Sequence, residues 1–237
     1  MKLEVSRITW QDSRGALQKP LTAAFVCDVH DGPYDHILPC LTDVDMILIA
    51  GDLTNRHDPN PPRNAGGFLR TCVGAAPVWY SIGNHELKMR GARDWRKVME
   101  DSGAHILDNT VEQARADLWI GGLSSQLHPV DDTAPRLLSG KDGFRLLLCH
   151  HPEYYEPLVM KHDIDLTLAG HAHGGQFRIL GHGLYAPGQG LFPRLTSGFY
   201  EDRRLLVSRG TGTHGIIPRL WNPCQLIILT LLPKDGA

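Results

Sequence analysis

The sequence predicts an α/β protein whose sheets are covered on both faces. Eight strand-sized apolar runs, rich in β-branched residues, recur along the chain, and several are almost continuously apolar, as in strands buried on both sides. Segments of helical character separate the early runs, and from Gly174 onward we expect only strands and loops rich in glycine and proline. No repeat, low-complexity block or linker divides the chain, which predicts a single domain over residues 1–237.

The predicted strands can be placed one by one. A loose alternation of apolar and polar residues over residues 3–10 predicts an outer strand. The eight apolar runs predict buried strands at Leu21–Cys27, Asp45–Ala50, Pro77–Ile82, Leu118–Leu123, Phe144–Cys149, Asp165–Ala169, Arg204–Ser208 and Gln225–Leu232.

Three segments carry helix-like patterns. The clearest is Ala92–Ser102, where apolar residues recur on one helical face and Gly103 follows as a stop signal. Weaker helices are expected at Asn64–Val73, which contains two adjacent glycines, and at Tyr154–Lys161, which contains a proline.

Composition and charge exclude several functional classes. Of the 237 residues, 42% are hydrophobic and 21% are charged, which is ordinary for a globular protein and excludes general disorder. The 24 basic and 26 acidic residues give a net charge of −2, so there is no electrostatic footprint for non-specific binding to nucleic acids or to an anionic membrane. Histidine occurs 13 times, which directs attention to metal and acid–base sites.

Cysteine usage and hydropathy predict a cytoplasmic location. The five cysteines form no C-x-x-C pair, and their odd number favours reduced thiols over a disulfide framework. The first twenty residues carry charges throughout, unlike the apolar core of a signal peptide. The apolar run Leu226–Leu232 is far shorter than the ~20 residues that cross a bilayer. We therefore expect a cytoplasmic protein without a membrane partner.

Metal-competent side chains directly follow five of the apolar runs. These clusters are Asp28-Val29-His30, Gly51-Asp52, Gly83-Asn84-His85-Glu86, His150-His151 and Gly170-His171-Ala172-His173. In open α/β sheets, ligands bind outside the carboxyl ends of the strands, so we expect the clusters to meet in one crevice. Glycines beside Asp52, Asn84 and His171 allow the backbone to turn sharply and to approach a bound ion.

The candidate ligands in these clusters are two carboxylates, one amide and four imidazoles. This set exceeds the needs of one tetrahedral site and suits two borderline ions that share a carboxylate. Asp52, alone in its turn, is the natural bridge. Two ions about 3.5–4 Å apart clamp the attacking and leaving oxygens of a phosphoryl transfer. Because two divalent cations outweigh two carboxylates, the centre stays positive and attracts an anionic phosphate.

Taken in order, the five clusters resemble the motifs of the calcineurin-like metallophosphoesterases over residues 28 to 173. The segments GHAHGGQ and LLVSRGTGTHG are similar to the branch of small bacterial metal-dependent phosphodiesterases. The resemblance implies a four-layer αββα sandwich, in which two mixed β-sheets are flanked by helices, and a dinuclear metal site. Because the segment between Asp28 and Asp52 is short and contains two prolines, we expect the helix there to be abbreviated.

The resemblance also implies roles for individual residues. The first ion would be held by Asp28, His30 and His173, Asp52 would bridge, and the second ion would be held by Asn84, His150 and His171. His85 would protonate the leaving oxygen or stabilise charge in the transition state during in-line attack on phosphorus by a metal-bound hydroxide. His150 comes first after its strand and is therefore the better ligand of an adjacent pair, whereas His151 would support the site. These ligands fit Mn, Fe, Zn or Co as the two divalent ions.

The leading functional hypothesis is a metal-dependent phosphoesterase, a phosphodiesterase or a phosphatase, that hydrolyses a small phosphorylated substrate. A non-catalytic scaffold with the same fold is an alternative, although such a protein would be expected to lose His85 or several ligands. A nuclease or cyclic-nucleotide phosphodiesterase is another, but the missing basic surface argues against polymeric nucleic acid as a partner. The sequence leaves open whether the substrate is a monoester, a diester or a pyrophosphate, and it does not determine the oligomeric state.

Three further features have two interpretations each. Gly210–Gly215 matches the G-x-G-x-x-G fingerprint of dinucleotide binding, but the proline-rich sequence after it cannot supply the required helix, which favours a turn near the metal centre. Arg56, Arg63 and Arg90 follow metal motifs and either contact substrate phosphate or lie solvated at the surface. The loop Gly181–Leu195 either lines the substrate cleft or is an ordinary surface loop.

Overall fold

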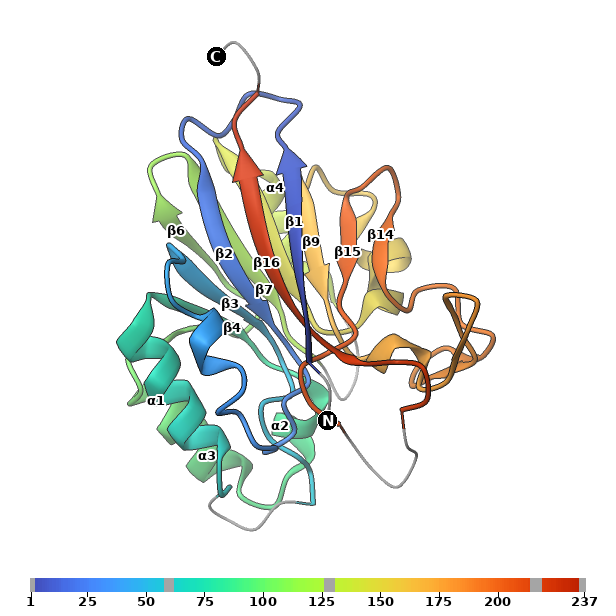
Figure 1. Cartoon of the computed structure of the whole chain (residues 1–237). Helices are drawn as coiled ribbons and strands as arrows, with labels where there is room; N and C mark the ends of the chain where they lie inside the picture. Colours follow the sequence, from blue (N-terminus) through green and yellow to red (C-terminus); the bar gives the residue numbers. More distant parts are fainter. Residues whose placement is uncertain (1–2, 58–61, 126–130, 214–218, 235–237) are drawn as a thin grey trace.

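Two six-stranded β-sheets form the centre of the protein (Figure 1). The computed structural model describes residues 3–57, 62–125, 131–213 and 219–234. The first sheet has the strand order β1 (Leu3–Gln11), β16 (Cys224–Leu232), β2 (Leu21–Val26), β3 (Met46–Ala50), β4 (Val78–Ser81) and β5 (His105–Leu107). The second sheet has the order β14 (Gly198–Tyr200), β15 (Leu205–Val207), β9 (Leu166–Ala169), β8 (Phe144–Cys149), β7 (Leu118–Leu123) and β6 (Val111–Arg115).

Both sheets are mixed. In the first, β2 to β5 are parallel and β1 is parallel to β16, whereas β16 runs antiparallel to β2. In the second, β7, β8, β9 and β15 are parallel, and the edge strands β6 and β14 are antiparallel to their neighbours. Parallel neighbours end at the same edge of a sheet, so the loops after β2, β3 and β4 gather together, as do those after β8 and β9.

The main core lies between the two sheets. Alternate side chains of each strand point into it, including Phe25 and Leu48 from the first sheet and Leu146 and Leu168 from the second, all fully buried. The apolar residues between them, such as Ile49, point to the outer faces and are buried there. This two-sided burial explains why the strands read as nearly continuous apolar runs.

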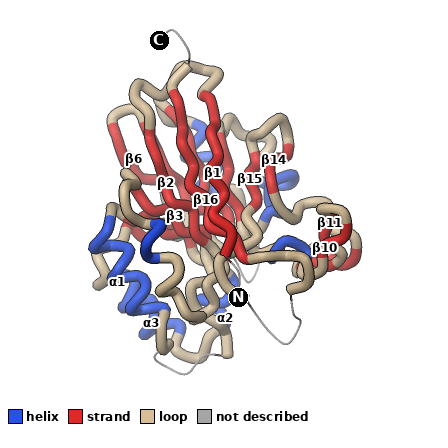
Figure 2. Tube along the Cα trace, viewed as in Figure 1, coloured by secondary structure: helices blue, strands red, loops and turns tan. Residues whose placement is uncertain are grey.

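Helices form the two outer layers (Figure 2). Two of them, α1 (Ala65–Ala75) and α3 (Ala92–Glu100), pack on the outer face of the first sheet. Helix α4 (Thr133–Ser139) and a π-helical turn at Tyr155–Val159 pack on the outer face of the second sheet. The four layers confirm the predicted αββα sandwich of two mixed sheets.

The predicted helices are present with shifted bounds. The segment Ala92–Ser102 contains α3, whose apolar face is buried against the sheet, and Asn64–Val73 corresponds to α1 despite its two glycines. The segment Tyr154–Lys161 is reduced to the π-helical turn, which contains the proline. Between the first two metal motifs, a 3₁₀ turn at Leu38–Cys40 confirms the expected abbreviation.

The sequence patterns do not reveal β5, β6, α4 or the short helix α2 (Asn84–Lys88). The two strands lie at sheet edges and are short and partly exposed, so they lack a long apolar run. Helix α4 contains a proline in its first turn, a position that needs no helical N–H partner.

After residue 175, two small hairpins project at one side of the molecule (Figure 1). They consist of β10 (Arg178–Ile179) with β11 (His182–Gly183) and of β12 (Tyr185–Ala186) with β13 (Gly190–Leu191). Within the described segments, no helix combines the length and the apolar composition that spanning a membrane requires.

Candidate metal centre

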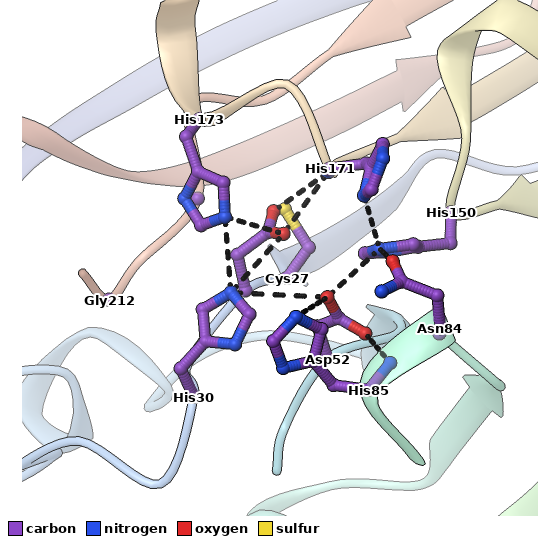
Figure 3. Close-up of polar contacts among 12 residues, drawn as sticks. Cys27, His30, Asp52, Asn84, His85, His150, His171, His173 and Gly212 are labelled. Carbon is purple, nitrogen blue, oxygen red and sulfur yellow. Dashed lines mark hydrogen bonds and ion pairs between the residues drawn. The ribbon is translucent and has the colours of Figure 1, made fainter. Parts of the chain in front are cut away.

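The side chains predicted as metal ligands meet at one end of the two sheets (Figure 3). They directly follow five strands: Asp28 and His30 after β2, Asp52 after β3, Asn84 after β4 as the first residue of α2, His150 after β8, and His171 and His173 after β9. All seven are buried. The structure therefore brings the whole predicted set together, as the strand-end argument requires.

Five of these seven residues have a left-handed backbone conformation. Their φ angles lie between 47° and 64°, at Asp28, His30, Asp52, His171 and His173. Residues other than glycine rarely adopt this conformation, which costs on the order of 1–3 kcal/mol where the surrounding structure enforces it. The bends turn the chain sharply after each strand, so side chains of neighbouring loops face one another. Strain concentrated in one polar cluster indicates a functional site.

Glycines in the motifs let the loops of the two sheets approach closely. A Cβ atom at Gly170 would stand 2.6 Å from Oδ2 of Asp28, and one at Gly51 would stand 2.8 Å from Nδ1 of His150. Both separations are far shorter than the 3.5–4.0 Å or so of ordinary van der Waals contact. The absent side chains thus allow strand ends of the first sheet to lie directly against those of the second.

Asp28, His30 and His173 form one group of potential ligands. Nε2 of His30 lies 3.1 Å from Nε2 of His173, and Oδ1 of Asp28 lies 3.8 Å from Nε2 of His30 and 3.6 Å from Nε2 of His173. With Zn–N bonds of about 2.0–2.1 Å, two imidazole nitrogens on one tetrahedral ion stand about 3.3 Å apart. The three side chains therefore fit a shared metal ion.

Nε2 of His150 is the centre of a second group. It lies 3.1 Å from Oδ2 of Asp52, 3.2 Å from Oδ1 of Asn84 and 3.2 Å from Nδ1 of His171. The other ring nitrogen, Nδ1, lies 2.7 Å from the carbonyl oxygen of Ala50. Because a carbonyl oxygen only accepts, Nδ1 carries a proton, so Nε2 is the nitrogen whose lone pair the ring offers to the group when the ring is neutral.

Asp52 lies between the two groups. In addition to its contact with His150, its Oδ2 is 3.9 Å from Nε2 of His30 and 4.0 Å from Nε2 of His85. Among the described residues, four overlapping sets of three side chains have ligand atoms within 4.8 Å of one another, and Asp52 belongs to two of them. Carboxylate, amide and imidazole ligands suit divalent transition metals, so the donor set fits metal binding.

Burial and neighbouring charges favour the metal-binding protonation states of three of these groups, Asp52, His171 and His173. Burial acts to raise the pKa of Asp52, but neighbouring histidines, above all His150, outweigh it and hold the pKa well below its usual range. Burial lowers the pKa values of His171 and His173 well below the ordinary value, and adjacent imidazoles add to this effect. An ionised carboxylate and a neutral imidazole are the forms that coordinate metals.

His85 lies at the edge of the second group. The main-chain N–H of Arg56 donates to its Nδ1 over 3.1 Å, so the neutral ring carries its proton on Nε2. That nitrogen faces Oδ2 of Asp52 at 4.0 Å. His85 is thus placed to offer a proton beside the predicted ligands.

A cavity of about 760 Å³ opens at the group. Five predicted site residues line it: Asp52, Asn84, His85, His171 and His173. Arg56 and Lys88 add positive charge to the wall, and Tyr154 and Tyr185 add aromatic surface. Together with the proline and glycine at positions 187 and 188, Tyr185 places part of the loop Gly181–Leu195 in the cavity wall.

The two remaining arginines lie outside this wall. Arg63 and Arg90 have exposed side chains, and the main chain of Arg63 donates to Oδ2 of Asp31 at 2.9 Å, next to the first turn of α1. Among these three arginines, the geometry therefore favours Arg56 as the contact for a phosphate.

The glycine-rich segment Gly210–Gly215 turns against the candidate centre over its described part. The main-chain N–H of Gly212 donates to the carbonyl oxygen of Asp28 over 2.8 Å, and a Cβ atom at Gly210 would stand 2.7 Å from Cβ of Asp28. The last two residues of the segment, His214 and Gly215, lie outside the described residues.

Glu86 is a buried residue of the site to which the sequence analysis gave no role. Its carboxylate accepts the main-chain N–H groups of Asp52 (2.9 Å), Gly83 (2.8 Å) and Thr54 (3.0 Å) and the hydroxyl of Thr54 (3.2 Å). Burial, and then the charge of Asp52, raise its pKa to about 6. Glu86 therefore fixes the loop after β3 to the loop after β4. The only sequence feature that could have indicated this role is the position of Glu86 three residues after Gly83.

Two further contacts support the centre from outside. Nη2 of Arg219 lies 3.0 Å from Nδ1 of His173. Because a guanidinium only donates, this bond places the proton of the neutral ring on Nε2, and coordination through Nε2 requires that proton to move to Nδ1. On the other side, Nδ1 of His151 lies 3.0 Å from Oε1 of Glu153, and its ring lies 4.1 Å from that of His171. His151 thus lies beside the predicted ligand His171, and its supporting role stays a prediction. The contact of Arg219 was not predicted because Arg219 and His173 are far apart in the sequence.

The sequence model that describes the calcineurin-like phosphoesterases matches residues 21–175, most of the chain and all seven predicted ligands. The chain belongs to the calcineurin-like phosphoesterase family. The recognition made from the motifs is thereby confirmed, and the αββα sandwich is the fold in which the family motifs come together here.

Relatives in this phosphoesterase family differ in length. YpbG of Bacillus subtilis is 26% identical over 223 residues, which cover 90% of this chain and 81% of YpbG. A metallophosphoesterase of Helicobacter pylori is 30% identical over 205 residues, which cover 82% of this chain but only 53% of that protein. Among solved structures, a 5′-nucleotidase precursor from Thermus thermophilus is similar with a TM-score of 0.47 and 15% identity, over 90% of this chain and 54% of that one.

Proposed function

We propose that this protein is a metal-dependent phosphoesterase that hydrolyses a phosphate ester at a centre of two divalent ions. The observation that carries the proposal is the position of Asp52, whose Oδ2 lies 3.1 Å from Nε2 of His150 and 3.9 Å from Nε2 of His30. One carboxylate thus adjoins both ligand groups. Membership of the calcineurin-like phosphoesterase family supports the same activity.

The proposal assigns ligands to each ion. Asp28, His30 and His173 hold the first ion, Asn84, His150 and His171 hold the second, and Asp52 is shared. Mn, Fe, Zn and Co all suit these ligands. When bound, the ions supply a nucleophile at neutral pH and neutralise charge on the phosphate.

The side chains around the cavity perform the remaining tasks. Arg56 and Lys88 attract the anionic group to the cavity. The N–H at Nε2 of His85 donates a hydrogen bond that stabilises the negative charge developing on the leaving oxygen, which takes its proton from water and departs as an alcohol. The contact between the Arg56 N–H and Nδ1 of His85 keeps that proton on the nitrogen nearer Asp52.

The proposed substrate is a small phosphorylated molecule, not a polymeric nucleic acid. The net charge of −2 gives no broad basic surface for a polyanion, whereas a cavity of about 760 Å³ has the size of a small-molecule site. Binding of a small substrate is expected to respond weakly to added salt.

The test combines metal analysis with a substrate panel. Purified protein is assayed with p-nitrophenyl phosphate, bis-p-nitrophenyl phosphate and inorganic pyrophosphate, with added Mn²⁺ and after chelation. Metal-dependent hydrolysis of at least one substrate is expected, with about two ions per chain. Asp52→Asn should abolish it, whereas Asp35→Asn, the same change at an exposed residue, should not. Equal rates for Asp52→Asn and the unaltered protein would refute the proposal.

A further inference from the structure

Large apolar side chains are exposed on one region of the surface. The described part of the chain exposes ten large apolar side chains; seven of them lie in the two hairpins and the segment 219–221, and six of these seven, all but Tyr185, are more than 40% exposed. We call these six the apolar rim: Ile179, Leu180, Leu191, Phe192, Leu220 and Trp221. Leu180 is 94% exposed, Phe192 80% and Trp221 78%. Clusters of this kind mark interaction sites, unlike single exposed apolar residues.

Three members of the apolar rim lie on one face of the protein. Ile179, Leu180 and Trp221 line the same shallow cavity of about 360 Å³, and the main-chain N–H of Arg178 donates to the carbonyl oxygen of Leu220. Figure 2 shows β10 and β11 projecting beyond the sheets at one side of the molecule.

Hydrogen bonds join the second hairpin to this face. The main-chain N–H of Phe192 donates to the carbonyl oxygen of Leu184 over 2.9 Å, and the N–H of Leu184 donates to the carbonyl oxygen of Phe177 over 2.9 Å. Phe177 in turn forms a β-bridge with Leu220. The three segments are therefore connected through their main chains.

The most exposed members of the rim occupy an unfavourable backbone conformation. The φ angles of Leu180, Phe192 and Trp221 are 49°, 53° and 51°, in a region that turns usually fill with glycine or asparagine. A bulky apolar side chain at such a position gains no burial within this chain. An apolar environment outside the protein would provide that burial.

The charge of this region indicates what kind of apolar environment could cover the rim. Residues 166–200 contain no aspartate or glutamate but contain Arg178, His182 and Arg194. Arg194 pairs with Glu156 and Glu201. The guanidinium of Arg178 contacts oxygen atoms of the main chain and of Thr196, and no described carboxylate lies within ion-pair distance of it. The rim thus combines apolar tips with a cation that lacks a carboxylate partner, although the whole chain has a net charge of −2.

This combination matches an anionic lipid surface better than a second copy of the chain. Tryptophan is favoured at the membrane–water interface, and basic residues near it are attracted to anionic headgroups. In a symmetric dimer the same patch would face itself, which would bring the basic residues of two copies together.

The hairpin β12–β13 connects the apolar rim with the cavity of the candidate centre. Tyr185 lines that cavity, and Leu191 is its partner across the hairpin. A surface bound by the rim would therefore lie beside the wall of the cavity.

We propose that the apolar rim binds the surface of a lipid bilayer with anionic headgroups and so presents the cavity to phosphate esters at that surface. The second part rests on the proposed function, whereas the first does not. The expectation of no membrane partner came from overall charge and from the length of apolar runs, and neither quantity detects single residues at loop tips.

Vesicle sedimentation tests this proposal. Vesicles of phosphatidylcholine alone and of phosphatidylcholine with phosphatidylglycerol are mixed with the full chain at low and high salt. Binding to the anionic vesicles is expected, with weaker binding at high salt. The combined variant Leu180→Ser, Phe192→Ser and Trp221→Ser should reduce the bound fraction at least tenfold. The matched control, Val5→Ser with Leu137→Ser, changes exposed apolar residues on β1 and α4 and should bind like the unaltered chain.

Two parallel measurements make the outcome decisive. Circular dichroism and hydrolysis of a soluble ester check that the rim variant is folded. The proposal would be overturned if the chain bound neither kind of vesicle, or if the rim variant bound as well as the unaltered chain. It would also be overturned if the chain bound no vesicles but self-associated, and the rim variant lost that self-association. Vesicle binding without hydrolysis of any ester would support the membrane-binding rim and refute the proposed phosphoesterase activity. Hydrolysis without vesicle binding would support the activity and refute the membrane-binding rim.

Discussion

The main-chain N–H of His85 donates a hydrogen bond of 2.9 Å to Oδ1 of Asp52. The other oxygen of the same carboxylate faces Nε2 of His150 at 3.1 Å and Nε2 of His85 at 4.0 Å. The position of His85 is thus tied to the proposed shared ligand through the backbone. A change in the His85 side chain should therefore leave the ligand geometry intact.

His85→Gln is expected to lower kcat by about 10²–10³-fold for esters with a poor leaving group, because the charge that develops on the leaving oxygen then has to be stabilised. The loss should be much smaller for p-nitrophenyl esters, whose leaving group departs without a proton. Rates with phenyl and p-nitrophenyl esters, measured beside metal content, check this. An equal loss on both esters would contradict the assigned role.

Glu86 predicts a pH dependence of stability. Its folded pKa of about 6 lies above the ordinary value of 4.5, so the folded state binds the proton more tightly than the unfolded state. The contribution of Glu86 is therefore most favourable below pH 4.5 and falls by about 2 kcal/mol as the pH rises through 6. Urea unfolding of chelator-treated protein and of Glu86→Gln at several pH values measures the difference. A difference that stays constant from pH 4 to 7 would exclude this effect.

Metal affinity is expected to fall as the pH falls. Burial acts to lower the pKa of His150, but Asp52 outweighs burial and raises it to about 10. His150 is therefore protonated at pH 7 in chelator-treated protein, and metal binding must displace its proton. Calorimetric titration with Mn²⁺ in two buffers of different ionisation enthalpy counts the released protons. At least one proton per chain is expected at pH 7, and a count of zero would disprove the coupling.

Gly83→Ala is expected to destabilise the protein by about 1–3 kcal/mol, in the range of overpacked sites, and to weaken metal binding. The added Cβ would overlap the main-chain nitrogen and Oδ1 of Asp52 and stand 2.8 Å from Oε2 of Glu86. Gly74→Ala is the matched control, since nothing lies within 4 Å of a Cβ there and alanine in a helix is favoured over glycine by about 0.5–1 kcal/mol. Chemical unfolding of both variants decides the matter, and similar stabilities would disprove the close approach.

The sequence predicts the fold well where burial leaves a pattern. Strands such as β2 and β3 are covered on both faces, so they read as apolar runs. The strands β5 and β6, at the sheet edges, bury too little to leave that pattern. The ligand residues could be found because each directly follows a strand, and the left-handed turns at five of them bring them together.

The supporting residues were harder to predict because their partners are distant in sequence or belong to the main chain. Arg219 contacts His173 across 46 positions, and nothing in its local sequence indicates that contact. The bonds of Glu86 go largely to main-chain N–H groups, which no side-chain pattern can reveal. The apolar rim escaped notice because its exposure is set by turn geometry.

The central position of β16 has a consequence for biosynthesis. This strand lies between β1 and β2 and pairs Leu226 with Val5 and Leu229 with Ala23, so the first sheet cannot close until the ribosome has made residues 224–232. At about 5–20 residues per second, the strand that precedes Asp28 waits on the order of 10–40 s for its neighbour. A nascent chain exposes apolar strands during that time, and such exposed surface is prone to aggregation. Metal loading is consequently expected to follow the synthesis of residues 224–232.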